Sequence, residues 1–251
     1  MKADYVIVGA GSAGCVIANR LSADPKVSVV LLEAGPADLN PWIHIPVGYF
    51  KTIHNPTVDW CYKTEPDQGL NGRSIDWPRG RVLGGSSSLN GLLYVRGQPQ
   101  DYDRWAQMGN KGWGWEDVLP LFKRSEKNER GADEFHGDQG NLSVSNMRIQ
   151  RPITDAWVEA AQSAGYKFNP DYNGADQEGV GFFQLTAKNG RRCSSAVAFL
   201  NPVKSRKNLT IITHAQAEKL LIEEGEARGV VANIKGQSQT IRARREVILS
   251  A

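Results

Sequence analysis

An apolar strand that runs directly into closely spaced glycines is the feature that most constrains the fold of this chain. Tyr5 to Val8 form the expected strand, and after the glycines a helical stretch extends from Ala13 to Leu21. A second apolar run, Val27 to Glu33, follows. A strand, a helix and a parallel strand in this order form a right-handed crossover. The sequence therefore predicts an α/β fold of the Rossmann type with a parallel central sheet.

The spacing of the glycines is typical of a dinucleotide-binding turn. Gly9 allows a tight turn, Gly11 leaves room for a diphosphate, and Gly14 lets the helix pack closely against the strand. Free N–H groups at the helix start would hold the diphosphate. Glu33 follows at about the distance where a carboxylate accepts hydrogen bonds from both ribose hydroxyls, and it would repel the 2′-phosphate of NADP. A glycine-rich turn in an unrelated α/β protein is the alternative, and it leaves Glu33 unexplained.

Apolar residues at helical spacing predict three further helices, at Pro99–Met108, Trp115–Ser125 and Pro152–Ala164. The expected core positions of the first two are Trp105, Val118, Leu121 and Phe122. Before these helices, the glycine- and proline-containing stretch 35–81 is expected to be a long irregular connection.

Strand-like runs fill the later part of the chain. One strand is expected at Val180–Thr186, and a final apolar strand at Val247–Ala251. Between them, turn residues separate four short strands of an antiparallel meander, at Leu209–Thr213, Ala217–Glu223, Gly229–Ile234 and Gln239–Ala243. Because a buried strand is an unusual place for a terminus, we expect this sequence to be the N-terminal piece of a longer protein, truncated at its C-terminus.

Composition limits the partners of the chain. The net charge is +3 and the basic clusters are not interleaved with aromatic residues, so nucleic acid is not expected as a partner. The three cysteines are too far apart for a metal knuckle and indicate reduced thiols in a cytoplasmic protein, with Cys15 a small buried residue. No run reaches the roughly 18 apolar residues that span a bilayer, which leaves association with a membrane surface open.

A second glycine-rich loop lies between Gly80 and Gly97. Gly84 and Gly85 precede three serines and an apolar segment, so backbone N–H groups and hydroxyls are exposed without bulky side chains. Such a loop can lie flat against a cofactor. Taken alone, the sequence chemistry of this loop favours a serine turn that caps a helix.

Together the two glycine-rich segments resemble the glucose-methanol-choline (GMC) family of FAD-dependent oxidoreductases, and its bacterial choline-type and aliphatic alcohol dehydrogenases in particular. The second loop is similar to the first signature of that family. The other stretches that carry the resemblance are Asn71–Arg73, Trp77–Gly80, Asp101–Asp103 with Trp105, Gly112–Trp113, His136–Gly137, Gly190–Arg191, Ser194–Ala196 and Phe199–Leu200.

The resemblance implies a GMC-type FAD-binding fold over residues 1–251 with part of an α+β substrate domain. Residues 1–150 would form the nucleotide-binding core and flavin loop, 151–204 the start of the substrate domain, and 205–251 the meander and return strand.

The resemblance also implies positions for FAD. Ser12, Ala13, Glu33 and Ala34 would line the diphosphate and the adenosine ribose together with Gly9, Gly11 and Gly14. The flavin would lie along Val82, Asn90, Gly91, Leu92 and Leu93, with its isoalloxazine beside Gly85 and Ser86, and Ala217 would meet the adenine through its backbone. Some family members attach the flavin to a histidine where this chain has Leu89, so the FAD is expected to be non-covalent.

The activity implied by the resemblance is oxidation of a primary alcohol to an aldehyde, with hydride transfer to flavin N5. The histidine that takes the hydroxyl proton belongs to the C-terminal part of the family. None of His44, His54, His136 and His214 matches it, and each is expected to be a surface or structural residue. No catalytic residue and no metal site is assigned, and the piece alone is expected to be inactive.

Several alternatives stay open at this stage. The substrate could be choline-like, aliphatic or aryl, and the electron acceptor is undetermined. The enzyme could be an oxidase that uses O2, or an FAD-containing hydroxynitrile lyase. A non-catalytic nucleotide sensor is the third reading, disfavoured by the apolar surface it would expose.

Overall fold

The computed structural model describes all 251 residues and divides into two compact units. The first contains Met1–Gly91 and Arg192–Ala251, and the second contains Leu92–Arg191. These limits differ from residues 150 and 204, where the sequence places segment boundaries. The boundaries from the sequence concern which segments build a substrate domain, and they stay a prediction.

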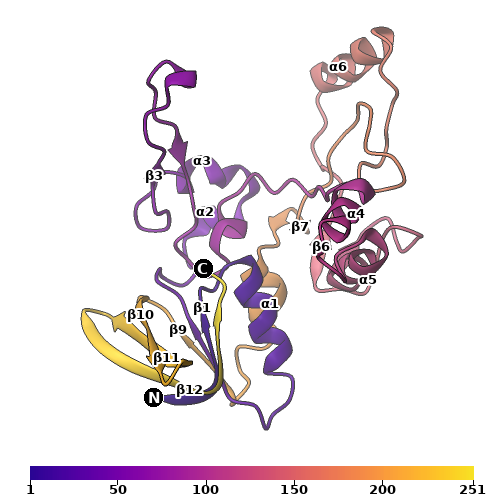
Figure 1. Ribbon diagram of the computed structural model, residues 1–251. Coiled ribbons are helices and arrows are strands. Elements are labelled where there is room, and N and C mark those ends of the chain that lie inside the picture. The colour runs from indigo at the N-terminus through magenta and orange to yellow at the C-terminus, as the bar shows by residue number, and fades with distance from the viewer. The chain divides into compact units, whose positions relative to one another are not determined.

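A six-stranded sheet forms the centre of the first unit, in the order β10-β11-β12-β1-β2-β9 (Figure 1). Strands β12, β1, β2 and β9 are parallel neighbours, whereas β10, β11 and β12 form an antiparallel meander. All four residues of β2 are buried, as expected for a strand covered on both faces. The prediction of an α/β fold with a mostly parallel central sheet is confirmed. The strands are β1 (Lys2–Val8), β2 (Val29–Leu32), β9 (Leu209–Ile212), β10 (Ala215–Glu223), β11 (Glu226–Ile234) and β12 (Gln237–Leu249).

Strand β12 joins what the sequence predicts as two separate strands. Its first half pairs antiparallel with β11, and its second half pairs parallel with β1 (Figure 1). The register with β1 shifts opposite Asp4, where Arg244 lies 3.6 Å from the Asp4 carboxylate. The charged residues Arg244 and Arg245 break the apolar pattern but not the extended backbone. For this reason hydrophobicity alone divided the strand incorrectly.

Two tight turns connect the meander as expected. Glu224 and Gly225 both have positive φ, and so do Lys235 and Gly236. Two consecutive residues of positive φ form the hairpin turn whose twist matches that of the flanking strands.

Helix α1 (Ser12–Leu21) packs against the end of β1. A Cβ at Gly14 would lie 1.9 Å from the carbonyl oxygen of Gly9, so only glycine permits this approach. Cys15 is fully buried in this helix, as predicted. The side chain of Asn19 donates to the carbonyl of Phe199 in a short π-helix, η4 (Ala196–Leu200), which also contacts α1.

The connection between residues 35 and 81 is largely irregular, as predicted, but it contains a hairpin. We call residues 58–81 the Trp60 hairpin. Its two edges are joined where the Arg81 N–H donates to the Val58 carbonyl and the Trp60 N–H donates to the Arg79 carbonyl. The short elements of the whole connection are α2 (Pro41–His44), η1 (Pro46–Gly48), α3 (Tyr49–Thr52), β3 (Tyr62–Lys63), η2 (Gln68–Leu70) and β4 (Asp76–Trp77).

The second unit contains the three predicted helices, now bounded as α4 (Pro99–Gln107), α5 (Trp115–Ser125) and α6 (Pro152–Ser163). Val118 is buried and Phe122 is partly buried, but Trp105 and Leu121 are about half exposed, so these two expected core positions are wrong for this chain. The remaining short strands are β5 (Glu126–Asn128), β6 (Leu142–Val144), β7 (Ala187–Lys188) and β8 (Arg191–Arg192), the last ending in the first unit.

The predicted strand Val180–Thr186 does not form. Only isolated bridges occur there, such as Phe168 with Val180 and Ser145 with Leu185. Gln184 is buried because its side chain exchanges hydrogen bonds with Asn128, not because it belongs to a ladder. The apolar residues of this segment gave it the composition of a strand, but no continuous ladder of hydrogen bonds forms.

A network of buried charges lies inside the second unit. The guanidinium of Arg96 lies 2.7 Å from the Glu126 carboxylate, and Nδ1 of His136 lies 3.0 Å from the same carboxylate. The other ring nitrogen of His136 lies 2.9 Å from Asp171. Burial acts to lower the pKa of His136, but the hydrogen bonds to Asp171 and Glu126 outweigh it and raise the pKa to about 9. His136 is therefore the structural residue that the sequence predicts, charged at neutral pH.

No helix in the structure is both long enough and apolar enough to cross a bilayer.

Candidate functional site

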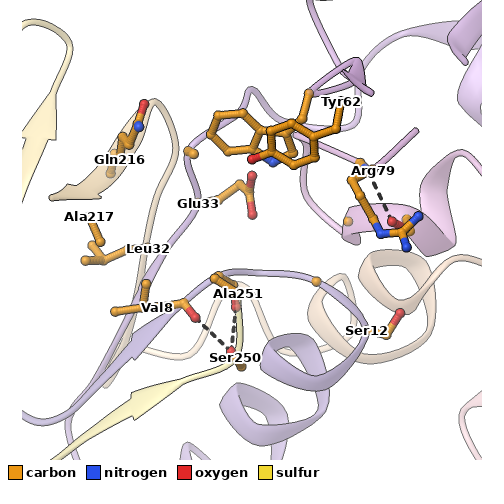
Figure 2. A pocket seen from close by; sticks show the side chains of 18 residues that line it. Val8, Ser12, Leu32, Glu33, Tyr62, Arg79, Gln216, Ala217, Ser250 and Ala251 are labelled. Atoms are coloured by element: carbon orange, nitrogen blue, oxygen red, sulfur yellow. Dashed lines mark hydrogen bonds between the residues drawn. The ribbon is translucent and has the colours of Figure 1, made fainter. Parts of the chain in front are cut away.

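A cavity of about 430 Å³ opens at the carboxyl ends of β1 and β2, next to the start of α1. This is the position where open α/β sheets bind their ligands. All of its lining residues belong to the first unit. In Figure 2, Ser12 and Arg79 lie on one side of the cavity, Gln216 and Ala217 lie on the other, and Glu33 lies between them.

The N-terminus of α1 faces this cavity through Gly11 and Ser12. No side chain caps the helix at Gly11, and its first turn contains no acidic residue. The first N–H groups and the positive end of the helix dipole therefore suit an anion. A Cβ at Gly11 would have its nearest neighbour, the Ser250 carbonyl oxygen, 4.0 Å away, so the approach to the backbone is open.

Glu33 lines the cavity and is only 6% exposed. One carboxylate oxygen accepts the N–H of Ala10 at 3.0 Å, and the other accepts the N–H of Gly35 at 2.9 Å. Burial raises the pKa of Glu33, and these two N–H groups oppose the shift. Because each carboxylate oxygen has a second lone pair, Glu33 can hold both glycine-rich backbone and a ligand hydroxyl.

The second glycine-rich loop packs directly against the first. The N–H of Gly84 donates to the Ala10 carbonyl, and a Cβ at Gly85 would lie 2.7 Å from the Cα of Gly11. Gly85 also has a φ of +53°, a conformation that favours glycine. The serines of this loop form the 3-10 turn η3 (Gly85–Ser88), which has no side-chain cap. The loop is thus part of the cavity wall, and its Ser87 hydroxyl also accepts the N–H of Ser195, the residue that precedes η4.

The predicted site residues divide into two groups. The residues that line the cavity are Gly9, Gly11, Ser12, Glu33, Ala34, Gly85, Ser86 and Ala217. The others do not line it: Gly14 and Val82 are buried, Ala13, Asn90 and Gly91 are exposed, and Leu92 and Leu93 belong to the second unit. Nothing here tests their contact with a cofactor, so these assignments stay predictions.

The Trp60 hairpin supplies lining residues that sequence reasoning missed. Trp60 and Tyr62 stack with ring centroids 5.7 Å apart and an interplanar angle of 5°. Arg79 lines the cavity from the other edge of the hairpin. The stretch Trp77–Gly80 contributed to the family resemblance, but its place in the site was not inferred. The sequence analysis also missed Val8, Leu32, Gly80, Ala215, Gln216, Ser250 and Ala251.

A crevice at the end of a parallel sheet, with an uncapped helix start and a buried carboxylate, defines a dinucleotide-binding protein of the Rossmann class. The chain belongs to the GMC oxidoreductase family, whose profile matches residues 3–251. Membership implies FAD as the cofactor, and the helix start and Glu33 fit its diphosphate and ribose.

Known proteins of related sequence are similar along nearly the whole chain. An "alcohol dehydrogenase [acceptor]" from Pseudomonas putida is 50% identical over 98% of this chain and 45% of its own length. An "oxygen-dependent choline dehydrogenase" from Sinorhizobium fredii is 45% identical over 100% of this chain and 46% of its own. The chain thus spans about half the length of these curated relatives.

Solved structures agree with the fold. The crystal structure of pyridoxine 4-oxidase from "Mesorbium loti" has a TM-score of 0.93 and 36% identity, covering 98% of this chain and 49% of the other. A formate oxidase from Aspergillus oryzae RIB40, described in connection with FAD modification, has a TM-score of 0.89 and 29% identity, covering 99% of this chain and 45% of the other.

Proposed function

We propose that this chain is the FAD-binding part of an enzyme that oxidises a primary alcohol to the aldehyde. The observation that carries the proposal is the cavity in which the α1 N-terminus, Glu33 and the second glycine-rich loop converge. When bound, FAD would accept the hydride from the carbinol carbon.

In this proposal the residues of this chain bind the FAD and orient it. The N–H groups at the start of α1 hold the diphosphate. Glu33 accepts hydrogen bonds from the ribose hydroxyls while it also fixes Ala10 and Gly35. The second loop, held against Gly11, offers a flat surface of glycine and serine. None of the four histidines lines the cavity, so we assign no proton acceptor within the chain.

We propose that the FAD is held without a covalent bond. Leu89 occupies the position where covalent relatives carry a histidine. Its side chain is buried among Ile43, Val58 and Val82 and contains no nucleophilic atom. Denaturation should therefore release all the FAD.

The names of the relatives support an alcohol substrate, with choline-like, aliphatic and aryl alcohols as the candidates. The similarity to an alcohol dehydrogenase that uses an acceptor favours a dehydrogenase. The similarity to pyridoxine 4-oxidase supports a second candidate, an oxidase whose acceptor is O2. The three free cysteines support a cytoplasmic location.

Cofactor binding is tested on the chain itself by titrating FAD and following its fluorescence. We expect saturable binding of FAD, weaker binding of NADP, and loss of binding in Gly11→Val, whose side chain enters the diphosphate position. A chain that retains NAD in preference to FAD would contradict the proposal.

The reaction is tested on the complete enzyme under anaerobic conditions. We expect a primary alcohol to bleach the flavin absorbance, and rapid reoxidation by O2 would identify an oxidase. Cyanide release from a hydroxynitrile without any bleaching by alcohols would support a lyase instead.

A further inference from the structure

The charged groups of the cavity are few. Among the side chains that line it, Glu33 is the one carboxylic acid and Arg79 is the one basic group. A dinucleotide diphosphate brings negative charge to the site, and a charge removed from water is costly unless it is compensated. The α1 N-terminus contributes only about half a positive charge. A side-chain cation at the same end of the cavity would add to this compensation, and Arg79 is the one cationic side chain in the lining.

Backbone packing places Arg79 at the diphosphate side of the cavity. The next residue is Gly80, and a Cβ added to it would lie 2.2 Å from the carbonyl carbon of Gly85. Gly85 in turn abuts Gly11, which immediately precedes α1. Three segments in direct contact therefore connect Arg79 to the helix start, and Figure 2 shows Arg79 on the Ser12 side of the cavity.

The Arg79 side chain is partly fixed and still has donors free. Its Nη1 donates to the Pro78 carbonyl at 2.8 Å, and the guanidinium carbon lies 4.9 Å from the ring centroid of Trp77. No carboxylate pairs with it within the chain. A guanidinium has five N–H donors, so the others are available to phosphate oxygens in the bidentate geometry that arginine favours.

Asp59 fixes the backbone beneath Arg79 and is only 2% exposed. One of its oxygens accepts the N–H groups of Cys61 and Arg79, both at 2.9 Å, and the other accepts the N–H of His54 at 2.8 Å. Asp59 thus ties the edge that carries Trp60 and Tyr62 to the edge that carries Arg79. It is a positioning residue for both.

From this geometry we infer that Arg79 recognises the diphosphate of the bound dinucleotide, opposite the α1 N-terminus. The ligand class is an adenosine diphosphate ester, bound at this end through charge. The inference rests on the proposed function, because it places a dinucleotide in this cavity.

The test is a calorimetric titration of the 251-residue chain with ADP, AMP and adenosine. We expect Arg79→Gln to weaken ADP binding about tenfold, the loss of one charge-assisted hydrogen bond, and adenosine binding by less than about twofold. Arg79→Lys should lose less ADP affinity because it keeps the charge. Added salt should weaken ADP binding to the unaltered chain more than to Arg79→Gln.

Arg73→Gln is the matched control. Arg73 is an exposed arginine of the same hairpin that does not line the cavity. Equal losses for ADP and adenosine in Arg79→Gln would overturn the inference, and so would an ADP affinity equal to that of Arg73→Gln. If the unaltered chain binds neither ADP nor FAD, the proposed function itself fails.

Discussion

The two units of this protein position their important groups by opposite means. In the first unit, glycines let backbone segments touch, so that N–H groups and carbonyls of β1, α1 and the second loop meet around the cavity. In the second unit, long charged side chains meet in the interior, with Glu126 between Arg96 and His136. The difference teaches that backbone packing of this kind can be predicted from short glycine motifs in the sequence. A cluster of side chains from distant positions cannot be predicted in this way.

The largest expected effect is the loss of the charge at the centre of the second unit. Glu126→Gln leaves the buried guanidinium of Arg96 and the charged ring of His136 without their shared carboxylate. Removing one partner of a buried ion pair costs about 3–5 kcal/mol of stability. Urea unfolding measures the cost, with hydrogen exchange to show that protection is lost first within residues 92–191. An equal loss of protection in the six-stranded sheet would mean that the two units do not differ in the way described.

A single added methyl group should destabilise the first unit. Gly14→Ala places a Cβ 1.9 Å from the carbonyl oxygen of Gly9, which as backbone cannot move aside easily. We expect about 1–3 kcal/mol of destabilisation, as for other overpacked sites, measured by thermal unfolding. Gly11→Ala is the control, because its Cβ has no neighbour closer than 4.0 Å. This variant should keep its stability and lose FAD affinity.

The stability of the second unit should depend on alkaline pH. The folded-state pKa of His136 is about 9, above the ordinary value of 6.5, so the folded state binds the proton more tightly than the unfolded state. The resulting stabilisation is complete below about pH 6.5 and is lost as the pH rises toward 9, by up to about 3 kcal/mol. Unfolding measured from pH 6 to pH 10 checks this. A His136→Gln variant with the same alkaline dependence would show that another group is responsible.

The smallest expected effect separates the two ends of the cavity. Glu33→Gln keeps the size of the side chain but removes the charge that ribose hydroxyls would donate to. The affinity for adenosine and for ADP should fall together, by about 1 kcal/mol, the difference between a charged and a neutral acceptor, whereas Arg79→Gln should affect ADP alone. Calorimetry of both variants with both ligands measures the contrast. If the Glu33→Gln variant binds adenosine with unchanged affinity, Glu33 does not bind the ribose.

Most of the first unit could be predicted, and its exceptions have physical causes. The spacing of Gly9, Gly11 and Gly14 encodes a turn and a close packing that depend on neighbours in the sequence. The two positive-φ turns of the meander are equally local. Strand β12 was divided incorrectly because Arg244 and Arg245 interrupt its apolar pattern without interrupting its hydrogen bonds.

The second unit was predicted less completely. Its helices follow from local periodicity, but Trp105 and Leu121 are exposed although their spacing is that of a buried face. The segment at Val180–Thr186 has strand-like composition, and yet Gln184 is buried through side-chain hydrogen bonds to Asn128. Periodicity identifies an apolar face of a helix or strand, but it does not report whether another part of the protein covers that face.

The sequence by itself determined the crossover of β1, α1 and β2, the dinucleotide turn and the acid at the end of the second strand. These features depend on residues close together in the chain, where spacing fixes geometry. Only the tertiary structure brought Trp60, Tyr62 and Arg79 to the cavity and gave the Glu33 carboxylate its two backbone partners. Only the tertiary structure enclosed His136 between Glu126 and Asp171. Such contacts join residues far apart in the chain, and their energy depends on burial, which no local pattern records.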